Sequence, residues 1–325
     1  MSDGGVAAIF AVLGIGGLRV IHTALALVAR VLALVFESVF GVARSLSSLS
    51  SGDREPASGS TSAHRPNAPL SDDDVRDIPI RILNSTTSRE RAMEKFASYR
   101  EWSARFRLHE LLRTPKPYFD VIKAHYPQVM HHTTDKDDFV IIMEKPGHVP
   151  ELLHAVRETA YALGRDEDDA TEVVLEHFAF VSTFLYERVD AREHPYGKIV
   201  QIIDLSAVSM SDVLGIEVFG FLREYSASAK IANIERVHRV FIVNPPPGFT
   251  FVFNACKPLI STKTLKQIVV CASVDDARRE MSKVMSLDKV PKEYGGACAC
   301  GRCWRGDANE DALHAYVHEL NSRCG

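Results

Sequence analysis

The stretch KIVQIIDL (Lys198–Leu205) decides the fold class of this chain. It is short, almost continuously apolar and rich in β-branched residues, as is typical of a strand buried on both faces of a sheet. Three other runs share this character: DFVIIME (Asp138–Glu144), VHRVFIVN (Val237–Asn244) and QIVVCA (Gln267–Ala272). We therefore expect at least four strands in one domain.

Segments with helical spacing separate these strands. In Ser88–Arg107 the apolar residues Met93, Phe96 and Tyr99 recur at intervals of three. The other expected helices cover Pro150–Gly164, Asp168–Val189, Met210–Ala229, Phe249–Cys256 and Asp275–Met285. Strands that alternate with helices predict an α/β fold with a mainly parallel sheet, covered on at least one face.

The composition divides the 325 residues into five parts. Residues 1–45 are apolar and almost devoid of acids, and residues 46–79 are rich in Ser, Gly, Pro and Asp, so we expect a disordered linker there. A helical lead-in is expected over 80–120, the main domain over 121–297, and a cysteine-containing tail over 298–325.

The segment Val6–Phe36 is long enough to span a bilayer, for which about 20 residues suffice. Arg19, His22 and Arg30 interrupt it, and on a helix they lie along one narrow polar stripe. We favour a membrane-associating segment whose arginines reach the lipid headgroups. A cleaved targeting segment and a helix buried against the main domain are the alternatives. The favoured interpretation places the protein at the cytosolic face of a membrane, anchored or peripheral.

Charge and motif content exclude several functional classes. The net charge is −4 and no Lys/Arg-rich tract is interleaved with aromatics, which argues against a nucleic-acid partner. The sequence has no G-x-x-x-x-G-K-[ST] phosphate loop, no G-x-G-x-x-G between a strand and a helix, and no G-x-S-x-G elbow. For want of a nucleophile with its base, we do not expect an enzyme.

Two polar clusters were weighed as metal sites. His131 and His132, close to several aspartates, are interpreted as part of a polar turn before a strand. Cys298, Cys300 and Cys303 form C-x-C-x-x-C, with His314 and His318 downstream; clustered thiolates suit zinc, but the paired C-x-x-C spacing is absent. A free-thiol tail is favoured, a local disulfide or a lipidated cysteine remains open, and no metal site is assigned.

Several motifs in a fixed order carry a resemblance to a known family. They are KIVQIIDLSAVS (Lys198–Ser209), IERVHRVFIVNPPPGFTFVFNACKPLI (Ile234–Ile260), STKTLKQIVV (Ser261–Val270) and VPKEYGG (Val290–Gly296). Upstream, ERAMEKFASYREWSARF (Glu90–Phe106) and AHYPQVMHHTTDKDDFVIIMEKPG (Ala124–Gly147) match its lead-in and first strand region. From Glu90 to Gly296 the chain resembles the CRAL-TRIO lipid-binding domain, most closely its phosphatidylinositol-transfer branch.

The resemblance implies a sheet that floors a lipid pocket and a movable gate helix over it. A two-tailed lipid carries about 30 methylenes, each worth about 0.8 kcal/mol of burial, so a carrier must enclose its tails. We expect the pocket floor around Ile202 and Ile203. The gate residues implied by the resemblance are Phe249, Phe251, Val252 and Phe253, which follow a run of three prolines.

The resemblance also implies which residues of this chain would contact the lipid headgroup, and each is matched to the family motif separately. The family's phosphoinositide-binding glutamate falls on Glu235, and its lysine near the last strand falls on Gln267, with Lys266 one residue earlier. The Ser/Thr pair that reads phosphatidylcholine in some members falls on Ile199 and Gln201, so that specificity is not supported.

We therefore expect binding and intermembrane transfer of a phospholipid, such as phosphatidylinositol, or of a similar hydrophobic ligand. The alternative is a membrane-anchored lipid sensor or tether that regulates a partner without bulk transfer. The expected partners are the lipid and a membrane surface, and no cofactor other than the bound lipid is expected.

Overall fold

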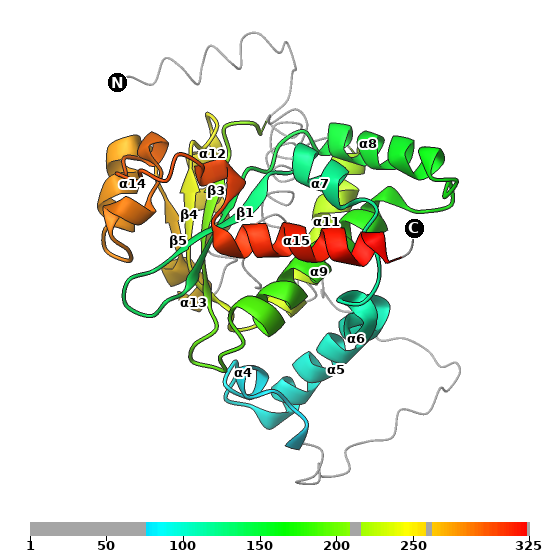
Figure 1. Ribbon diagram of the computed structural model, residues 1–325. Helices are drawn as coiled ribbons and strands as arrows, with labels where there is room; N and C mark the ends of the chain where they lie inside the picture. The colour runs from blue at the N-terminus through cyan, green and yellow to red at the C-terminus, as the bar shows by residue number, and fades with distance from the viewer. Residues whose placement is uncertain (1–75, 209–215, 258–261, 324–325) are drawn as a thin grey trace, which may run out of the picture.

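The computed structural model describes residues 76–208, 216–257 and 262–323 (Figure 1). The apolar segment Val6–Phe36 and nearly all of the linker lie outside these residues, so their predictions stay predictions. Among the helices of the described residues, none combines the length and the apolar character that a membrane span needs.

A five-stranded sheet lies at the centre of the domain, with its strands in the order β1-β2-β3-β4-β5. The strands are β1 (Gln128–Thr133), β2 (Val140–Glu144), β3 (Ile199–Asp204), β4 (Val237–Val243) and β5 (Ile268–Val270). β1 pairs with β2 antiparallel, and the other three pairs are parallel. The prediction of an α/β fold with a mainly parallel sheet is confirmed.

Two local predictions were wrong. His131 and His132 belong to β1 and not to a turn before a strand; the turn of this hairpin comes after Thr133. Gln267 is the last residue of a helix, α13 (Thr262–Gln267), and does not start the last strand. Both errors have one cause: short edge elements with polar residues lack the apolar run that marks the central strands.

The helices before β3 are α4 (Ile80–Leu83), α5 (Arg89–Arg105), α6 (Leu108–Leu111), α7 (Phe119–His125), α8 (Val149–Ala162) and α9 (Ala170–Phe184). A π-helical turn, Leu185–Val189, continues α9. Later helices are α11 (Ile216–Ala232), α12 (Phe249–Cys256), α14 (Val274–Met281) and α15 (Ala308–Ser322). The helices α5, α9 and α14 each begin with a side-chain N-cap. The side chains of Ser88, Asp169 and Ser273 each accept a hydrogen bond from the backbone N–H three residues later.

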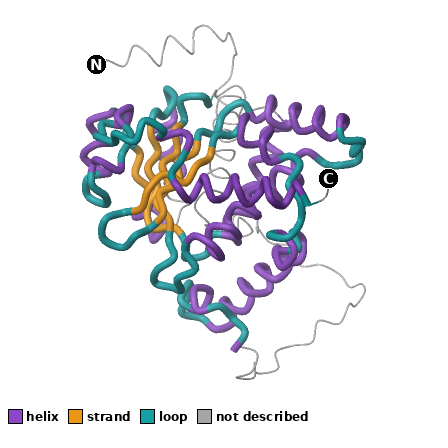
Figure 2. Tube along the Cα trace, viewed as in Figure 1, coloured by secondary structure: helices purple, strands orange, loops and turns teal. Residues whose placement is uncertain are grey.

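The order of the strands explains why the two faces of the sheet are covered differently. Each parallel crossover steps in the same direction along the sheet, and right-handed crossovers therefore place their helices on one face. On this face Leu175 and Phe180 of α9 pack with Ile142 and Ile199 of the sheet. Figures 1 and 2 show α8, α9 and α11 on one side of the strands and α14 on the other.

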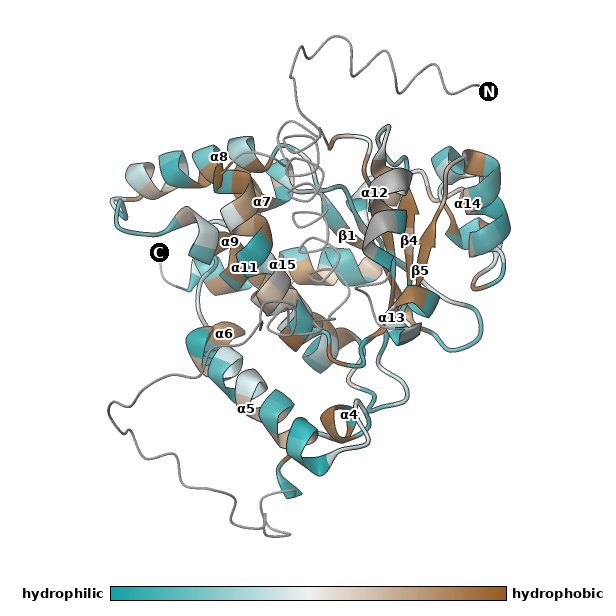
Figure 3. Cartoon of the chain, turned by 180° about the vertical axis from the view of Figure 1, so that it is seen from behind, coloured by the Kyte–Doolittle hydropathy of each residue, from teal (hydrophilic) through white to brown (hydrophobic). Residues whose placement is uncertain are grey.

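The opposite face of the sheet is covered by α14 and the loops after it. Ile141, Val200 and Ile202 pack there with Met281 and Val290. Figure 3 shows β4 and β5 as hydrophobic, whereas α14 presents a mostly hydrophilic surface. Since both faces are covered, every residue of β3 is buried, as its continuous apolar run predicts.

The C-terminal segment ends in α15, a helix that the sequence analysis did not assign. Leu313, Val317 and Leu320 of α15 join the core on the α9 side. The start of the helix is fixed to β1, because the backbone N–H of Asp307 donates to the Met130 carbonyl oxygen at 2.9 Å. Residues of the predicted tail thus pack against the domain that precedes them.

Candidate functional site

A cavity of about 50 Å³ lies between the sheet and the helices α9 and α11. Ile142, Ile199 and Gln201 form its floor on the side of β2 and β3. Trp102 of α5 closes one part of it, with the indole N–H donating to the Ser228 hydroxyl at 2.8 Å. This volume has room for only a few water molecules and is well below the about 300–1,000 Å³ that is typical of small-molecule sites.

Short side chains on the two helices leave this space open. Ala179 and Ser182 of α9 are three residues apart, as are Ala229 and Ala232 of α11, so each pair lies on one helical face. With larger residues at these positions the helices would fill the gap above the sheet. The cavity thus follows from where small residues are placed, and periodicity alone does not reveal it.

The cavity lining includes polar groups with unused hydrogen-bonding capacity. The side-chain oxygens of Gln128 and Gln201 are buried, line the cavity and have no donor among the residues that the structure describes. A buried acceptor without a partner is costly, by about 1–3 kcal/mol. A ligand that brings hydroxyl or amide donors would relieve this cost.

A buried carboxyl group lies beside Gln128, at the end of β2. Glu144 is 2% exposed and accepts from the Tyr126 hydroxyl at 3.3 Å and from the Gln128 amide at 3.2 Å. Burial raises the pKa of Glu144 to about 7, and the two hydrogen bonds oppose this rise. Burial likewise raises the pKa of Tyr225, whose side chain lines the cavity. Glu144 therefore gains and loses its proton near pH 7, whereas Tyr225 stays protonated.

The loop that follows α11 adjoins the other end of the cavity. Asn233 lines the cavity, and the N–H of Ile199 donates to the Arg236 carbonyl oxygen at 2.8 Å. The Arg236 guanidinium lies 4.2 Å from the centre of the Tyr186 ring, which also lines the cavity. Glu235 is held in this loop with φ of 58°, the left-handed region that non-glycine residues rarely adopt.

Glu235 forms an ion pair with a lysine that the sequence analysis did not name. Its side chain, 13% exposed, accepts from Lys263 of α13. Lys95 of α5 and Lys230 of α11 lie near the same loop: burial lowers the pKa of Lys95, Glu235 opposes this, and Lys263 and Lys230 add to it. One carboxylate and three ammonium groups thus gather at this end of the cavity.

The two headgroup positions expected on α13 behave differently from Lys263. The exposed Lys266 contributes its backbone carbonyl, which accepts from Arg239. The amide of Gln267 donates to the Val237 carbonyl oxygen at 2.7 Å and so joins α13 to β4. The comparison with the family motif assumed a strand and placed the headgroup lysine at Gln267 or Lys266. The segment is instead the helix α13, in which residues three or four apart share a face, and Lys263 is the lysine that pairs with Glu235.

The expected pocket floor is wrong for one of its two residues. Ile202 packs on the α14 face with Met281, away from the cavity. Neighbouring side chains of a strand point to opposite faces, so Ile202 and Ile203 could not both line one cavity. Ile203 is on the cavity face with Ile199 and Gln201 and is 4% exposed.

Helix α12 occupies the position expected of the gate in the sequence, directly after the three prolines, and lies alongside β4 in Figure 3. Phe249 and Phe253 are 5% and 6% exposed and stack with ring centres 6.4 Å apart. The side chains of Phe251 and Val252 lie outside the described part of the structure, so their gate role stays a prediction.

The family profile described as CRAL/TRIO domain matches residues 123–296, more than half of the chain. The chain belongs to the CRAL/TRIO domain family. The resemblance inferred from the strand and KP motifs is thereby confirmed.

Relatives and a solved structure agree with this assignment. The Sec14 cytosolic factor of Schizosaccharomyces pombe is 23% identical over 227 residues, 67% of this chain and 73% of that protein. The SEC14 cytosolic factor of Kluyveromyces lactis is 26% identical over 180 residues, 54% of this chain and 55% of that protein. The crystal structure of Sfh5 has a TM-score of 0.51 at 12% identity and covers 76% of this chain and 83% of its own, which supports the fold.

Proposed function

We propose that this protein binds a phospholipid with its headgroup near Glu235 and its tails in the cavity, and exchanges it between membranes. The observation that carries the proposal is the cavity between the sheet and helices α9 and α11, with the Glu235–Lys263 pair beside one end. The names of relatives agree: one, from Arabidopsis thaliana, is called a phosphatidylinositol/phosphatidylcholine transfer protein.

The charges beside the cavity suit a phosphate that is esterified to a polyhydroxylated headgroup. The ammonium groups of Lys95, Lys230 and Lys263 would donate to phosphate oxygens. The Glu235 carboxylate would accept hydrogen bonds from headgroup hydroxyls, which a choline headgroup does not have. This favours an inositol lipid over phosphatidylcholine as ligand.

A full two-tailed lipid requires the cavity to enlarge. If a methylene fills about as much space as a water molecule, about 30 Å³, then about 30 methylenes need about 900 Å³. The cavity measures about 50 Å³, which is room for only a few water molecules. We therefore propose that α12 moves outward to admit the tails, because it carries apolar rings and follows a proline-rich turn.

The decisive experiment identifies the lipid and follows its exchange. The full chain is purified from cells, co-purifying lipids are identified by mass spectrometry, and exchange of labelled phosphatidylinositol between vesicles is measured. Glu235→Ala and Lys263→Ala should each lower exchange by about tenfold, since one hydrogen bond to a charged group contributes about 1.5–3 kcal/mol. Lys283→Ala is the matched control, because Lys283 also pairs with a glutamate but lies on the α14 side.

The outcomes separate three cases. Loss of exchange in the Glu235 and Lys263 variants, with Lys283→Ala unchanged, supports the headgroup assignment. Unchanged exchange in all variants removes that assignment and leaves a carrier that does not bind the headgroup through Glu235 and Lys263. A chain that retains one lipid without exchanging it would instead favour the alternative, a lipid sensor or tether.

A further inference from the structure

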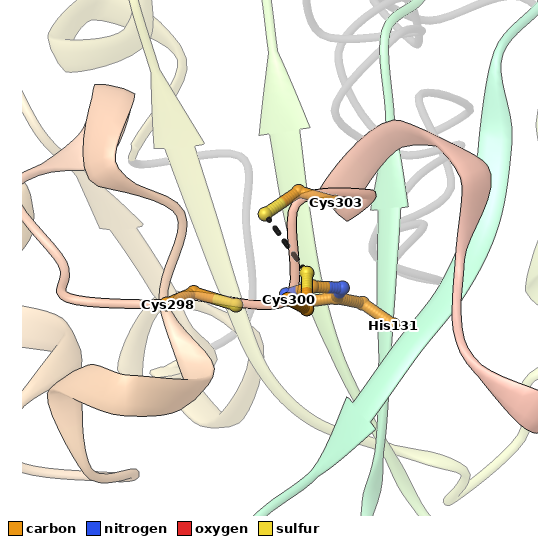
Figure 4. Close-up of side chains that lie close together, drawn as sticks. All are labelled: His131, Cys298, Cys300 and Cys303. Carbon is orange, nitrogen blue, oxygen red and sulfur yellow. Dashed lines mark hydrogen bonds between the residues drawn. The ribbon is translucent and has the colours of Figure 1, made fainter.

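Three cysteines, Cys298, Cys300 and Cys303, meet a histidine from the first strand. In Figure 4 the side chains of Cys298, Cys300 and Cys303 converge with that of His131. One ligand atom from each of the four residues lies within 4.8 Å of all the others, and the Cys300 and Cys303 sulfurs are 3.5 Å apart. With zinc–sulfur bonds of about 2.3 Å, the sulfurs of a tetrahedral zinc site are about 3.8 Å apart, so little movement is needed.

A β-bulge in β1 accounts for the position of His131. Met130 pairs with Ile142 and Thr133 pairs with Val140, so two residues of β1, His131 and His132, oppose one residue of β2. Such a bulge interrupts the alternation of side chains between the two faces. The two imidazole rings consequently lie close together, with ring centres 4.0 Å apart.

His131 is an unusual side chain for a protein interior. It is 0% exposed, and neither ring nitrogen has a hydrogen-bond partner among the described residues. Buried polar groups are nearly always hydrogen-bonded, because leaving them unpaired is costly. A metal ion bound by one of the ring nitrogens would give it a partner.

The other nearby histidines are placed for different roles. His132 has its Nε2 atom 3.5 Å from the Cys298 sulfur, where it can donate a hydrogen bond to a thiolate. His314, considered from the sequence, lies 3.3 Å from Glu310 and against the ring of Phe119. His318 is exposed on α15. A disulfide between Cys300 and Cys303 would leave His131 without a partner among the described residues.

We propose that Cys298, Cys300, Cys303 and His131 bind a zinc ion that joins the C-terminal segment to the edge of the sheet. Three thiolates and an imidazole form a soft ligand set, which favours zinc over magnesium or calcium. Four protein ligands complete a tetrahedron and leave no open position for a substrate, so the site is structural. The ion would hold residues 298–303 against β1 and thereby fix the start of α15.

This proposal revises the sequence expectation that no metal is bound. That expectation rested on the incomplete C-x-C-x-x-C spacing and on the placement of His131 in a turn. The fold supplies the fourth ligand from a distant strand. The zinc site lies apart from the cavity residues, so it can be tested independently of lipid exchange.

The first test measures the metal in the full chain. The protein is purified without chelators, and its zinc content should be about one ion per chain. Replacement of the metal by cobalt should produce a thiolate-to-cobalt charge-transfer band in the near ultraviolet. Both measurements use the unaltered full chain, so neither depends on whether a variant folds. Absence of zinc together with absence of this band would overturn the proposal, as would the recovery of Cys300 and Cys303 as a disulfide.

The second test assigns the ligands. Cys300→Ser, Cys303→Ser and His131→Ala should each weaken zinc binding by more than the about 10–100-fold that loss of an outer-shell partner costs. Cys271→Ala, which removes a buried thiol outside the cluster, should keep full zinc binding. If His132→Ala abolishes binding while His131→Ala keeps it, the assignment of His131 is wrong.

Discussion

Glu144 provides a quantitative test of the polar end of the cavity. Its carboxyl is 2% exposed, and burial raises its pKa from an ordinary 4.5 to about 7. The unfolded chain therefore loses this proton at a lower pH than the folded chain. Below about pH 4.5 both forms are protonated and the group costs nothing. As the pH rises from about 4.5 to about 7 the free energy of unfolding falls, and above about pH 7 this loss of stability stays constant.

The size of the penalty follows from the two pKa values. A tenfold change in proton affinity corresponds to about 1.4 kcal/mol, so a pKa of about 7 in place of 4.5 gives about 3 kcal/mol. Glu144→Gln replaces the acid with a neutral side chain of the same shape, which can still bond to Tyr126 and Gln128. The variant should equal the wild type near pH 4 and exceed its stability by about 3 kcal/mol near pH 8.

The assay is urea unfolding at several pH values, followed by the fluorescence of the buried Trp102 beside the cavity. Glu94→Gln, the same change at an exposed position of α5, is the control for the substitution itself. If the stability difference between wild type and Glu144→Gln stays constant from about pH 4 to 8, Glu144 does not titrate as argued. The raised pKa of Glu144 at this end of the cavity would then be refuted.

Three further predictions concern the cavity and the C-terminal helix. Ala229→Leu fills the cavity and should lower the amount of co-purified lipid measured by mass spectrometry, while the overpacking costs no more than about 3 kcal/mol in urea unfolding; normal lipid content would show that the ligand binds elsewhere. Glu310→Ala leaves the buried ammonium of Lys123 unpaired and should lower the unfolding free energy by about 3–5 kcal/mol, whereas a loss below about 1 kcal/mol would contradict a buried pair. Gly306→Ala places a Cβ 2.6 Å from the Met130 carbonyl oxygen at a φ of +77°, so its thermal midpoint should fall; an unchanged midpoint would show that this loop is free to shift.

The central strands and most of the helices could be predicted because their signals are local. The run Ile199–Asp204 is almost continuously apolar and every residue of that strand is buried, and the apolar second half of Val237–Val243 is buried as well. The motif that contains Phe249 predicted the helix Phe249–Cys256 with the bounds that the structure has, and Glu235 lies in a loop before β4. In both cases the information lies within about ten neighbouring residues.

The errors occurred where a neighbour distant in sequence decides the structure. β1 contains two histidines and becomes a strand because it pairs with β2, and its bulge appears only in that pairing. The predicted floor at Ile202 failed because nothing in the run itself tells which face of the sheet the helices cover. Lys263 was missed because a helix replaced an expected strand register.

The sequence alone determined the fold class, the family and the match of Glu235 to the family's headgroup glutamate. Apolar periodicity and short motifs record these properties directly, because they depend on neighbouring residues. The tertiary structure decided which lysine pairs with Glu235, where small residues leave a cavity, and that His131 meets the three cysteines. Those features depend on distances between chain segments far apart in sequence, and only the packing of helices against the two faces of the sheet sets such distances.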